Sequence, residues 1–225
     1  MSLIVIEGLD GSGKETQTRL LFEALCSENI PVRKVTFPDY ESPSSSLVRM
    51  YLAGEFGDKA ESVNAWTAST FYAVDRFASY KKVWGKDYLS EKLILADRYT
   101  TSNLTYQLSK LDEAEWDDFS AWLCDLEFSK MGLPEPDMVI YLDMLPEVSQ
   151  KLLSSRYGGN ESRKDIHEKD TAYLEKCRRA AAYAAEKFGW MIVRCDDGAN
   201  PRAVPDIHRD VMKNVLSLIK EDKNL

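Results

Sequence analysis

The amino-acid sequence predicts an α/β fold in which helices flank a parallel sheet. Five short runs rich in apolar and β-branched residues recur along the chain, and longer segments with helical periodicity separate them. Most of these runs are mainly apolar, as expected of strands that a parallel sheet buries on both faces. Their alternation with helices favours parallel strands joined by helical crossovers. The expected strands are Leu3–Glu7, Val32–Phe37, Lys92–Ala96, Met138–Leu142 and Met191–Arg194.

The segment Asp112–Met131 carries clear helix signals. Asp112 and Glu115 have the spacing of a capping box, in which each side chain accepts a hydrogen bond from the other residue's backbone N–H. Gly132 supplies a stop directly after the segment. Four large apolar residues are expected to share one face of this helix: Trp116, Phe119, Leu123 and Leu126.

Two further helices are expected in the last third of the chain. Thr171–Phe188 is ended by Gly189, and Pro205–Lys220 has a proline near its start, where proline is tolerated. The segment Tyr157–Asp165 is rich in glycine and charge and holds almost no apolar residue. We interpret it as a loop between two helices, where a mobile lid would lie.

Length and composition limit the class of protein. A chain of 225 residues, 44% apolar and 29% charged, can bury a sizeable core and has the composition of neither a disordered chain nor a coiled coil. The net charge of −8 argues against a binder of duplex DNA or of an anionic membrane, so an anion would need a local basic pocket. No linker or repeat divides the chain, and we expect a single domain over residues 1–225.

The cysteines and the first strand bear on location. Cys26, Cys124, Cys177 and Cys195 are far apart and none has C-x-x-C spacing, which favours buried free thiols over a disulfide framework or a zinc site. The apolar run Leu3–Ile6 has no basic segment before it and is too short for a signal peptide or a membrane span. We expect a cytoplasmic protein.

The most specific motif is Gly8-Leu9-Asp10-Gly11-Ser12-Gly13-Lys14, directly after the first expected strand. It matches G-x-x-x-x-G-K in the strand–loop–helix context that a phosphate-binding loop requires. Backbone N–H groups of such a loop surround phosphate oxygens, and the next helix directs its positive N-terminus at the same anion. Lys14 would contact the β and γ phosphates of ATP. We expect Glu15 and Thr16 to complete this ATP-binding segment.

Position 15 departs from the motif. A Ser or Thr there would hold Mg²⁺, but this chain has Glu15, and Thr16 points elsewhere on the helix. An inward carboxylate would repel phosphate, so we expect Glu15 to face away from the phosphates. The metal would then be held by phosphate oxygens, by water, and by carboxylates such as Asp97 or Asp10.

A second motif closes the third expected strand, which runs into Leu95-Ala96-Asp97-Arg98-Tyr99. A carboxylate at the carboxyl end of a strand beside a phosphate loop is placed to hold Mg²⁺ or its waters, and we assign this role to Asp97. The adjacent Arg98 can neutralise a second, acceptor phosphate. The N-K-x-D motif of GTPases is absent, and the chain is short for a motor ATPase. The length fits a small kinase.

Six features taken together are highly specific. They are Glu7-Gly8-Leu9-Asp10-Gly11-Ser12-Gly13-Lys14, Phe37-Pro38-x-Tyr40, Asp75-Arg76, Asp97-Arg98-Tyr99-x-x-Ser102, Pro136-Asp137 with Tyr141-Leu142-Asp143, and a lid at about residues 156–168. With them the chain resembles the thymidylate kinase family over nearly its whole length. The resemblance implies a P-loop kinase fold with a five-stranded parallel sheet, transfer of the γ-phosphate of ATP to dTMP to give dTDP, and a homodimer.

The resemblance also assigns residues to a dTMP site. Asp10 is similar to the carboxylate that contacts the deoxyribose 3′-hydroxyl, and Arg98 to the arginine of the acceptor phosphate. Tyr72 stands where the family usually has a phenylalanine stacked on thymine. Arg76, four residues on and therefore on the same helix face, is similar to the arginine that reads a thymine oxygen. The other expected dTMP contacts are Phe37, Tyr40, Asn103, Tyr106 and Glu168.

Phosphoryl transfer also needs a cation on the transferring phosphate. Some thymidylate kinases carry an arginine for this purpose in the phosphate loop, at the position where this chain has Gly11. The role then passes to the lid, whose candidates are Arg156, Arg163 and Lys164, and we expect Arg163 to supply it and Arg156 to contact ATP. The catalytic residues expected on this basis are Lys14, Arg98, Asp10 and Arg163.

Two positions depart from the family. Asp39 replaces a basic residue of some relatives and would repel the acceptor phosphate unless it points away, and His167 stands where some relatives have a tyrosine that crowds the sugar 2′ position. Two other functions stay open: a kinase for pyrimidine monophosphates in general or for a deoxynucleoside, and a module that binds a nucleotide without turnover. Lys14 and Arg98 together favour an enzyme whose substrate already carries a phosphate.

Overall fold

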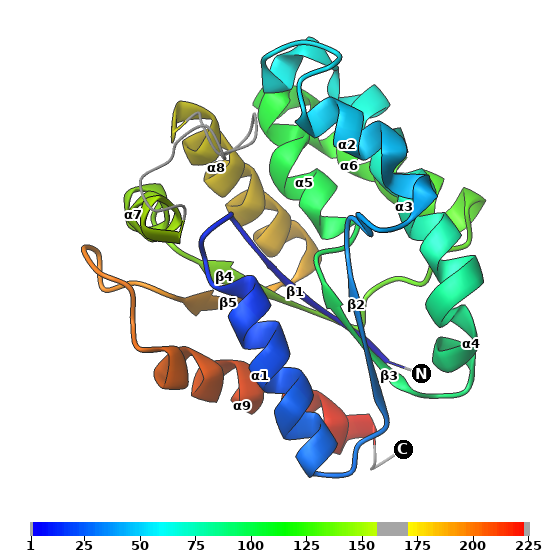
Figure 1. The fold of residues 1–225 in the computed structure, drawn as a ribbon, viewed down its shortest axis with the longest axis vertical. Coiled ribbons are helices and arrows are strands. Elements are labelled where there is room, and N and C mark those ends of the chain that lie inside the picture. The colour runs from blue at the N-terminus through cyan, green and yellow to red at the C-terminus, as the bar shows by residue number, and fades with distance from the viewer. Residues whose placement is uncertain (1, 157–170, 223–225) are drawn as a thin grey trace.

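A computed structural model describes residues 2–156 and 171–222. Within these residues, five parallel strands pair in the order β2-β3-β1-β4-β5 (Figure 1). The strands are β1 (Leu3–Gly8), β2 (Val32–Thr36), β3 (Leu93–Asp97), β4 (Met138–Asp143) and β5 (Met191–Arg194). The α/β fold of a P-loop kinase is therefore confirmed, and every expected strand is present with its ends shifted by at most one residue.

Burial differs between the middle and the edges of the sheet. All residues of β1 are buried, because neighbouring strands and helices cover it on every side. The edge strands β2 and β5 each have one buried residue, Val35 and Val193. The expectation of strands buried on both faces thus holds for the centre of the sheet and not for its edges.

Helices cover both faces of the sheet. They are α1 (Lys14–Ser27), α2 (Ser46–Leu52), α3 (Ala65–Ser79), α4 (Gly85–Leu89), α5 (Thr101–Tyr106), α6 (Trp116–Cys124), α7 (Pro146–Arg156), α8 (Thr171–Phe188) and α9 (Val204–Asp222). Helices α1 and α9 lie side by side on one face, where they pack on Ile4 and Ile6 of β1 (Figure 1). Residues of α3, α5, α6 and α8 share the opposite core with Leu3 and Val5. Successive side chains of β1 therefore point into opposite cores, as the two-residue period of a strand requires.

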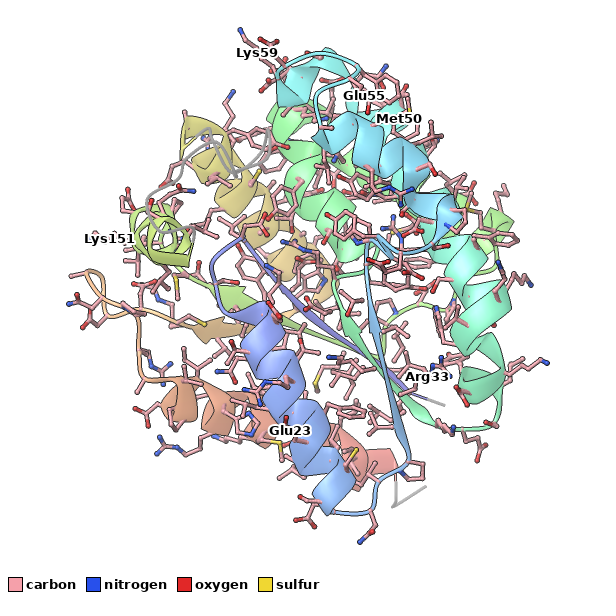
Figure 2. All side chains as sticks on the ribbon, in the orientation of Figure 1. Glu23, Arg33, Met50, Glu55, Lys59 and Lys151 are labelled. Atoms are coloured by element: carbon pink, nitrogen blue, oxygen red, sulfur yellow. The ribbon has the colours of Figure 1, made fainter. Side chains whose placement is uncertain are left out.

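Charged side chains lie on the outer surface of these layers. The labelled Glu23 of α1, Lys59 beyond α2, and Lys151 of α7 are exposed and project away from the sheet (Figure 2). In the described part of the chain, no helix combines the length and the apolar character that crossing a membrane requires.

The helix expected over Asp112–Met131 forms in three parts. A 3-10 turn at Glu113–Glu115 precedes α6, and a π-helix at Asp125–Lys130 follows it. The expected capping box is present at the start, and Gly132 follows the end with a φ of +68°. The segment is therefore helical over the expected range, but its last turns are wider than an α-helix.

The buried face of this segment differs from the expected face at one position. Trp116, Phe119 and Leu123 are buried as expected. Leu126 is only partly buried, and Glu127 is completely buried. Glu127 follows Leu123 by four residues and lies near the centre of the face that Trp116 and Leu123 define, whereas Leu126 lies at its edge. The expectation for Leu126 is therefore wrong.

The remaining expectations have mixed outcomes. Helix α8 ends before Gly189 as expected, and α9 extends the expected helix by one residue at its start and two at its end. The described cysteines are free thiols, but Cys26 is exposed and Cys124 only partly buried, so the expectation of buried thiols is wrong for Cys26. The expected lid segment Tyr157–Asp165 lies outside the described residues.

Candidate active site

Two cavities lie next to each other at the carboxyl ends of β1, β2 and β3, the edge where parallel α/β sheets bind ligands. The first, the phosphate-loop cavity, is lined by Gly11, Gly13, Lys14 and Asp97 among others. The second, the aromatic cavity, is lined by an aromatic group with two arginines: Phe37, Tyr40, Tyr72, Tyr99, Tyr106, Arg76 and Arg98. Asp10 and Arg98 line both cavities and therefore lie on their border.

The phosphate loop is closed by short backbone contacts. The Ser12 N–H donates to the Leu9 carbonyl at 3.1 Å, and Lys14 Nζ donates to the same carbonyl at 2.8 Å. Lys14 is 7% exposed, and its Nζ lies 3.8 Å from Asp10 Oδ1. Burial, and then the charge of Arg98, lower the pKa of Lys14. A phosphate that enters the loop would raise the pKa of Lys14 again, because its negative charge stabilises the charged ammonium group.

Gly11 is a position where only glycine fits. Its φ is +80°, and a Cβ there would lie 2.7 Å from the Ser149 carbonyl oxygen and 3.0 Å from Leu153 Cγ. Both neighbours belong to α7, which packs directly on the loop. A larger side chain, including the arginine of some thymidylate kinases, requires α7 to move.

The expected ATP-binding residues divide into two groups. Those that line the phosphate-loop cavity are Asp10, Gly11, Gly13, Lys14, Glu15 and Thr16. Gly8, Leu9 and Ser12 are buried, line neither cavity, and support the loop from within. The side chain of Arg156, at the end of α7, lies outside the described residues, as do Arg163, Lys164, His167 and Glu168.

Glu15 is exposed and, like Asp97, is among the residues that line the phosphate-loop cavity. The expectation that its side chain faces away from the phosphates stays a prediction. Burial raises the pKa of Asp97. The charges of Lys14 and Arg98 oppose this rise, and those of Glu7 and Glu15 add to it. A cation bound beside Asp97 would favour its ionised form.

Asp97 suits a hard cation such as Mg²⁺. Oxygen donors are the ligands that Mg²⁺ prefers, and it is bound through one or two carboxylates together with substrate phosphates and water. Over residues 2–156 and 171–222, no cluster of three or more Asp, Glu, His or Cys side chains could hold a metal alone. Asp97 fits the cation when phosphate oxygens and water complete its ligands. Asp10 fits it less well, because its oxygens already accept hydrogen bonds from Arg98 and Tyr106.

Arg98 is held in an uncommon backbone conformation. Its φ is +67°, a region that costs a non-glycine residue roughly 1 kcal/mol or more and is found at functional sites. Its N–H donates to the Ile6 carbonyl at 3.0 Å. Its guanidinium is paired with Asp10 and lies 5.3 Å from the centre of the Tyr106 ring. Burial alone would lower the pKa of Arg98, but Asp10 and its neighbours outweigh burial and raise the pKa well above the usual value, so the charge is secure.

Glu7 anchors the same arginine from behind. It is completely buried and accepts hydrogen bonds from the hydroxyls of Thr101 and Ser102, both at 2.7 Å, and from the Gly8 N–H at 2.9 Å. Arg98 Nη1 is 3.4 Å from Glu7 Oε1. No separate role was expected for Glu7. The available signal was a carboxylate inside a run of buried apolar residues, directly before a glycine-rich loop.

The structure brings together every described residue that was expected to contact dTMP. Asp10, Phe37, Tyr40, Tyr72, Arg76, Arg98, Asn103 and Tyr106 all line the aromatic cavity. Pro38, Leu52, Tyr99, Ser102 and Gln107 also line it and were not expected. Asp39 lines neither cavity, and its N–H donates to Asp75 Oδ2 at 2.8 Å.

A phosphate loop on a parallel sheet, an acid at the end of β3 and an arginine shared with a second cavity define a P-loop nucleotide kinase. The thymidylate kinase family model matches residues 6–204. The chain is 34% identical over 207 residues to the thymidylate kinase of Mycobacterium tuberculosis, covering 86% of this chain and 92% of that protein. It is 28% identical over 218 residues to that of Plasmodium falciparum, covering 96% and 90%. A probable thymidylate kinase of Thermococcus onnurineus is 30% identical over 212 residues, covering 93% and 94%.

The chain belongs to the thymidylate kinase family, and its activity is that of a thymidylate kinase, with ATP as the co-substrate of the family.

Proposed function

We propose that residues 1–225 form a single kinase domain that transfers the γ-phosphate of ATP to dTMP across the border between the two cavities. The observation that carries this proposal is the position of Asp10 and Arg98, which line both cavities. The phosphates of ATP bind in the phosphate-loop cavity, and dTMP binds in the aromatic cavity with its phosphate toward Arg98. The acceptor oxygen and the γ-phosphate then meet beside one fixed cation.

The phosphate-loop residues stabilise charge rather than form bonds. Lys14 contacts the β and γ phosphates, where a fixed cation stabilises the transition state more than the ground state. Asp97 would hold Mg²⁺ directly or through water, and the cation would supply charge neutralisation at the transferring phosphate. Asp10 orients Arg98 and accepts a hydrogen bond from the deoxyribose 3′-hydroxyl.

The aromatic cavity recognises the nucleoside. Tyr72 stacks on the base, and the ring of the buried Tyr51 supports it edge-on, with ring centres 6.5 Å apart. Arg76 and Asn103 face the polar edge of the base, while Phe37, Tyr40 and Tyr106 enclose the sugar and phosphate. The Tyr106 hydroxyl donates to Asp10 Oδ2 at 2.9 Å. Burial raises the pKa of Tyr106 well above its usual value, so the hydroxyl stays a donor.

The lid completes the site. We propose that Arg163 contacts the transferring phosphate, that Arg156 contacts ATP, and that Glu168 contacts the metal and sugar region of dTMP. The steric limit at Gly11 supports this division, because the loop itself has no room for a catalytic arginine.

One assay separates this proposal from its alternatives. ADP release is measured with dTMP, dUMP, dCMP and thymidine as acceptors at equal concentration. A preference for dTMP supports the proposal, and equal rates with all three monophosphates would support a general pyrimidine kinase. Release with thymidine but not with dTMP would support a deoxynucleoside kinase. Binding of nucleotide without ADP release would support a sensing module.

The remaining proposals concern assembly and location. We propose a homodimer through α3 and α6, because Trp66 of α3 is 37% exposed and packs edge-on against Phe119 of α6, and Val74, about two turns further along α3, is also exposed. Light scattering should give twice the chain mass of 25.6 kDa.

We propose a cytoplasmic setting because the described cysteines are free thiols, which a reducing compartment maintains. Cell fractionation tests this.

A further inference from the structure

Glu127 joins the residues on the base side of the aromatic cavity. It comes from the π-helix Asp125–Lys130, is completely buried, and does not itself line the cavity. Arg76 donates to both of its carboxylate oxygens, from Nε at 2.7 Å and from Nη2. Thr100 Oγ1 donates to Oε2 at 2.7 Å, and Asn103 Nδ2 lies 3.4 Å from Oε1. A single buried carboxylate therefore organises two residues of the cavity wall.

For Arg76, the carboxylate fixes the plane of the guanidinium. The two-point contact with Glu127 uses one edge of the group, and Nη1 donates to the Tyr99 carbonyl at 3.3 Å. Within the described part of the chain, these contacts use three of the five guanidinium N–H groups. The other two remain for a ligand, and their direction is fixed because the fork is rigid. The pair is electrically balanced, so the cavity offers donors at this end without an uncompensated cation.

For Asn103, the carboxylate fixes which end of the amide is available. The Nδ2 group lies 3.4 Å from both Glu127 Oε1 and the Ser69 carbonyl, and both partners can only accept hydrogen bonds. The amide must therefore direct its NH₂ group at them, which sets the orientation of the side chain. The carbonyl oxygen Oδ1 is then the atom that a ligand in the cavity meets, as an acceptor.

We propose that Glu127 is a specificity-determining positioning residue that makes the cavity select a 4-oxo pyrimidine base over cytosine. Glu127 orients Arg76, which presents hydrogen-bond donors to the base, and Asn103, which presents its carbonyl oxygen as an acceptor. Thymine and uracil present the complementary pair, a carbonyl at C4 and an N–H at N3. Cytosine presents the reverse pair, an amino group and an unprotonated ring nitrogen, and would leave buried polar groups unpaired. This inference rests on the proposed dTMP site.

The test is Glu127→Gln, which keeps the shape but replaces one acceptor oxygen with a donor. The value of kcat/KM is measured for dTMP, dUMP and dCMP at saturating ATP. We expect dTMP and dUMP to lose about tenfold or more by the same factor, mainly through KM, while dCMP is unchanged or improved. The KM for ATP is expected to stay constant. An equal loss for all three monophosphates would mean that Glu127 is only structural and would overturn the proposal.

Two further variants keep the test decisive. Asp143→Asn is the control, because Arg178 donates to both oxygens of this largely buried carboxylate in the same two-point geometry. This variant should leave the ratio of kcat/KM for dTMP to that for dCMP unchanged, whatever it does to stability. Thr100→Val removes one donor to Glu127 without changing charge, and should lower the ratio about twofold even if Glu127→Gln does not fold. An unchanged ratio in Thr100→Val, with Glu127→Gln unfolded or also unchanged, would overturn the proposal. If the unaltered protein shows no dTMP preference, the proposed dTMP site fails instead.

Discussion

Gly11 of the phosphate loop and the Ser149 carbonyl of α7 are so close that a Cβ at Gly11 would lie 2.7 Å from the carbonyl oxygen. The helix that leads toward the expected lid therefore rests on the loop that binds phosphate. Gly13 offers a matched comparison, since its φ is +90° and a Cβ there would meet no atom within 4 Å.

Gly11→Ala is expected to lower the melting temperature more than Gly13→Ala. Both changes place a side chain at positive φ, but only the first also collides with α7, at an added cost of about 1–3 kcal/mol. Thermal unfolding of the two variants checks this. Equal shifts would show that α7 does not press on the loop.

Lys14→Met is expected to leave the fold intact and to lower turnover at least on the order of a hundredfold, because a charge contact on the transferring phosphate is lost. Circular dichroism and the rate of ADP release at saturating substrates measure the two effects. Turnover near the original value would rule out the phosphate-loop mechanism.

Asp97→Asn is expected to raise the melting temperature at pH 7 and to lower turnover. Burial raises the pKa of Asp97 in the folded protein, so the folded state loses stability as the pH rises from the ordinary value of 3.8 through the raised one. The amide does not ionise and so removes that loss. The difference in melting temperature between the variant and the original protein should disappear below pH 3.8, where the carboxyl is protonated in both the folded and the unfolded state. Activity falls because the neutral amide replaces a charged carboxylate, which binds the cation more strongly.

Asp197→Asn is the control with the opposite sign. Backbone N–H groups of Asn200 and Ala199 lower the pKa of the exposed Asp197, so its ionised form favours the folded state at pH 7. This variant should lower the melting temperature at pH 7 and leave turnover unchanged. Melting shifts of the same sign in both variants would contradict the assignment for Asp97.

Arg163→Ala is expected to lower kcat while the dTMP dissociation constant changes little, because its contact forms mainly in the transition state. Arg156→Ala and Lys164→Ala serve as matched comparisons. If one of those two, and not Arg163→Ala, shows the selective loss of kcat, the catalytic role belongs to that residue.

The sequence was sufficient for features that depend on local pattern. The strands, the phosphate loop and the Asp97-Arg98 pair follow from apolar runs, glycine spacing and position after a strand. Contacts between distant segments were less accessible. Glu7 appeared only as part of a motif. In the fold it accepts hydrogen bonds from the hydroxyls of Thr101 and Ser102, which are more than ninety residues away in the sequence.

Glu127 shows how a buried charge can be missed. An α-helical period places it four residues after Leu123, near the centre of the face that Trp116 and Leu123 define, so the position itself was accessible from periodicity. A carboxylate is almost never fully buried without a partner, and its partner Arg76 is 51 residues away in the sequence.

The central claim is that ATP and dTMP occupy adjacent cavities and share Arg98 at their border. Titration calorimetry with adenosine and thymidine joined 5′ to 5′ through a chain of five phosphates tests it most directly. We predict binding at least about a hundredfold tighter than that of ATP or dTMP alone, competition by each of them, and loss of most of the gain in Arg98→Ala. Affinity no greater than that of ATP, or competition by ATP but not by dTMP, would contradict the account.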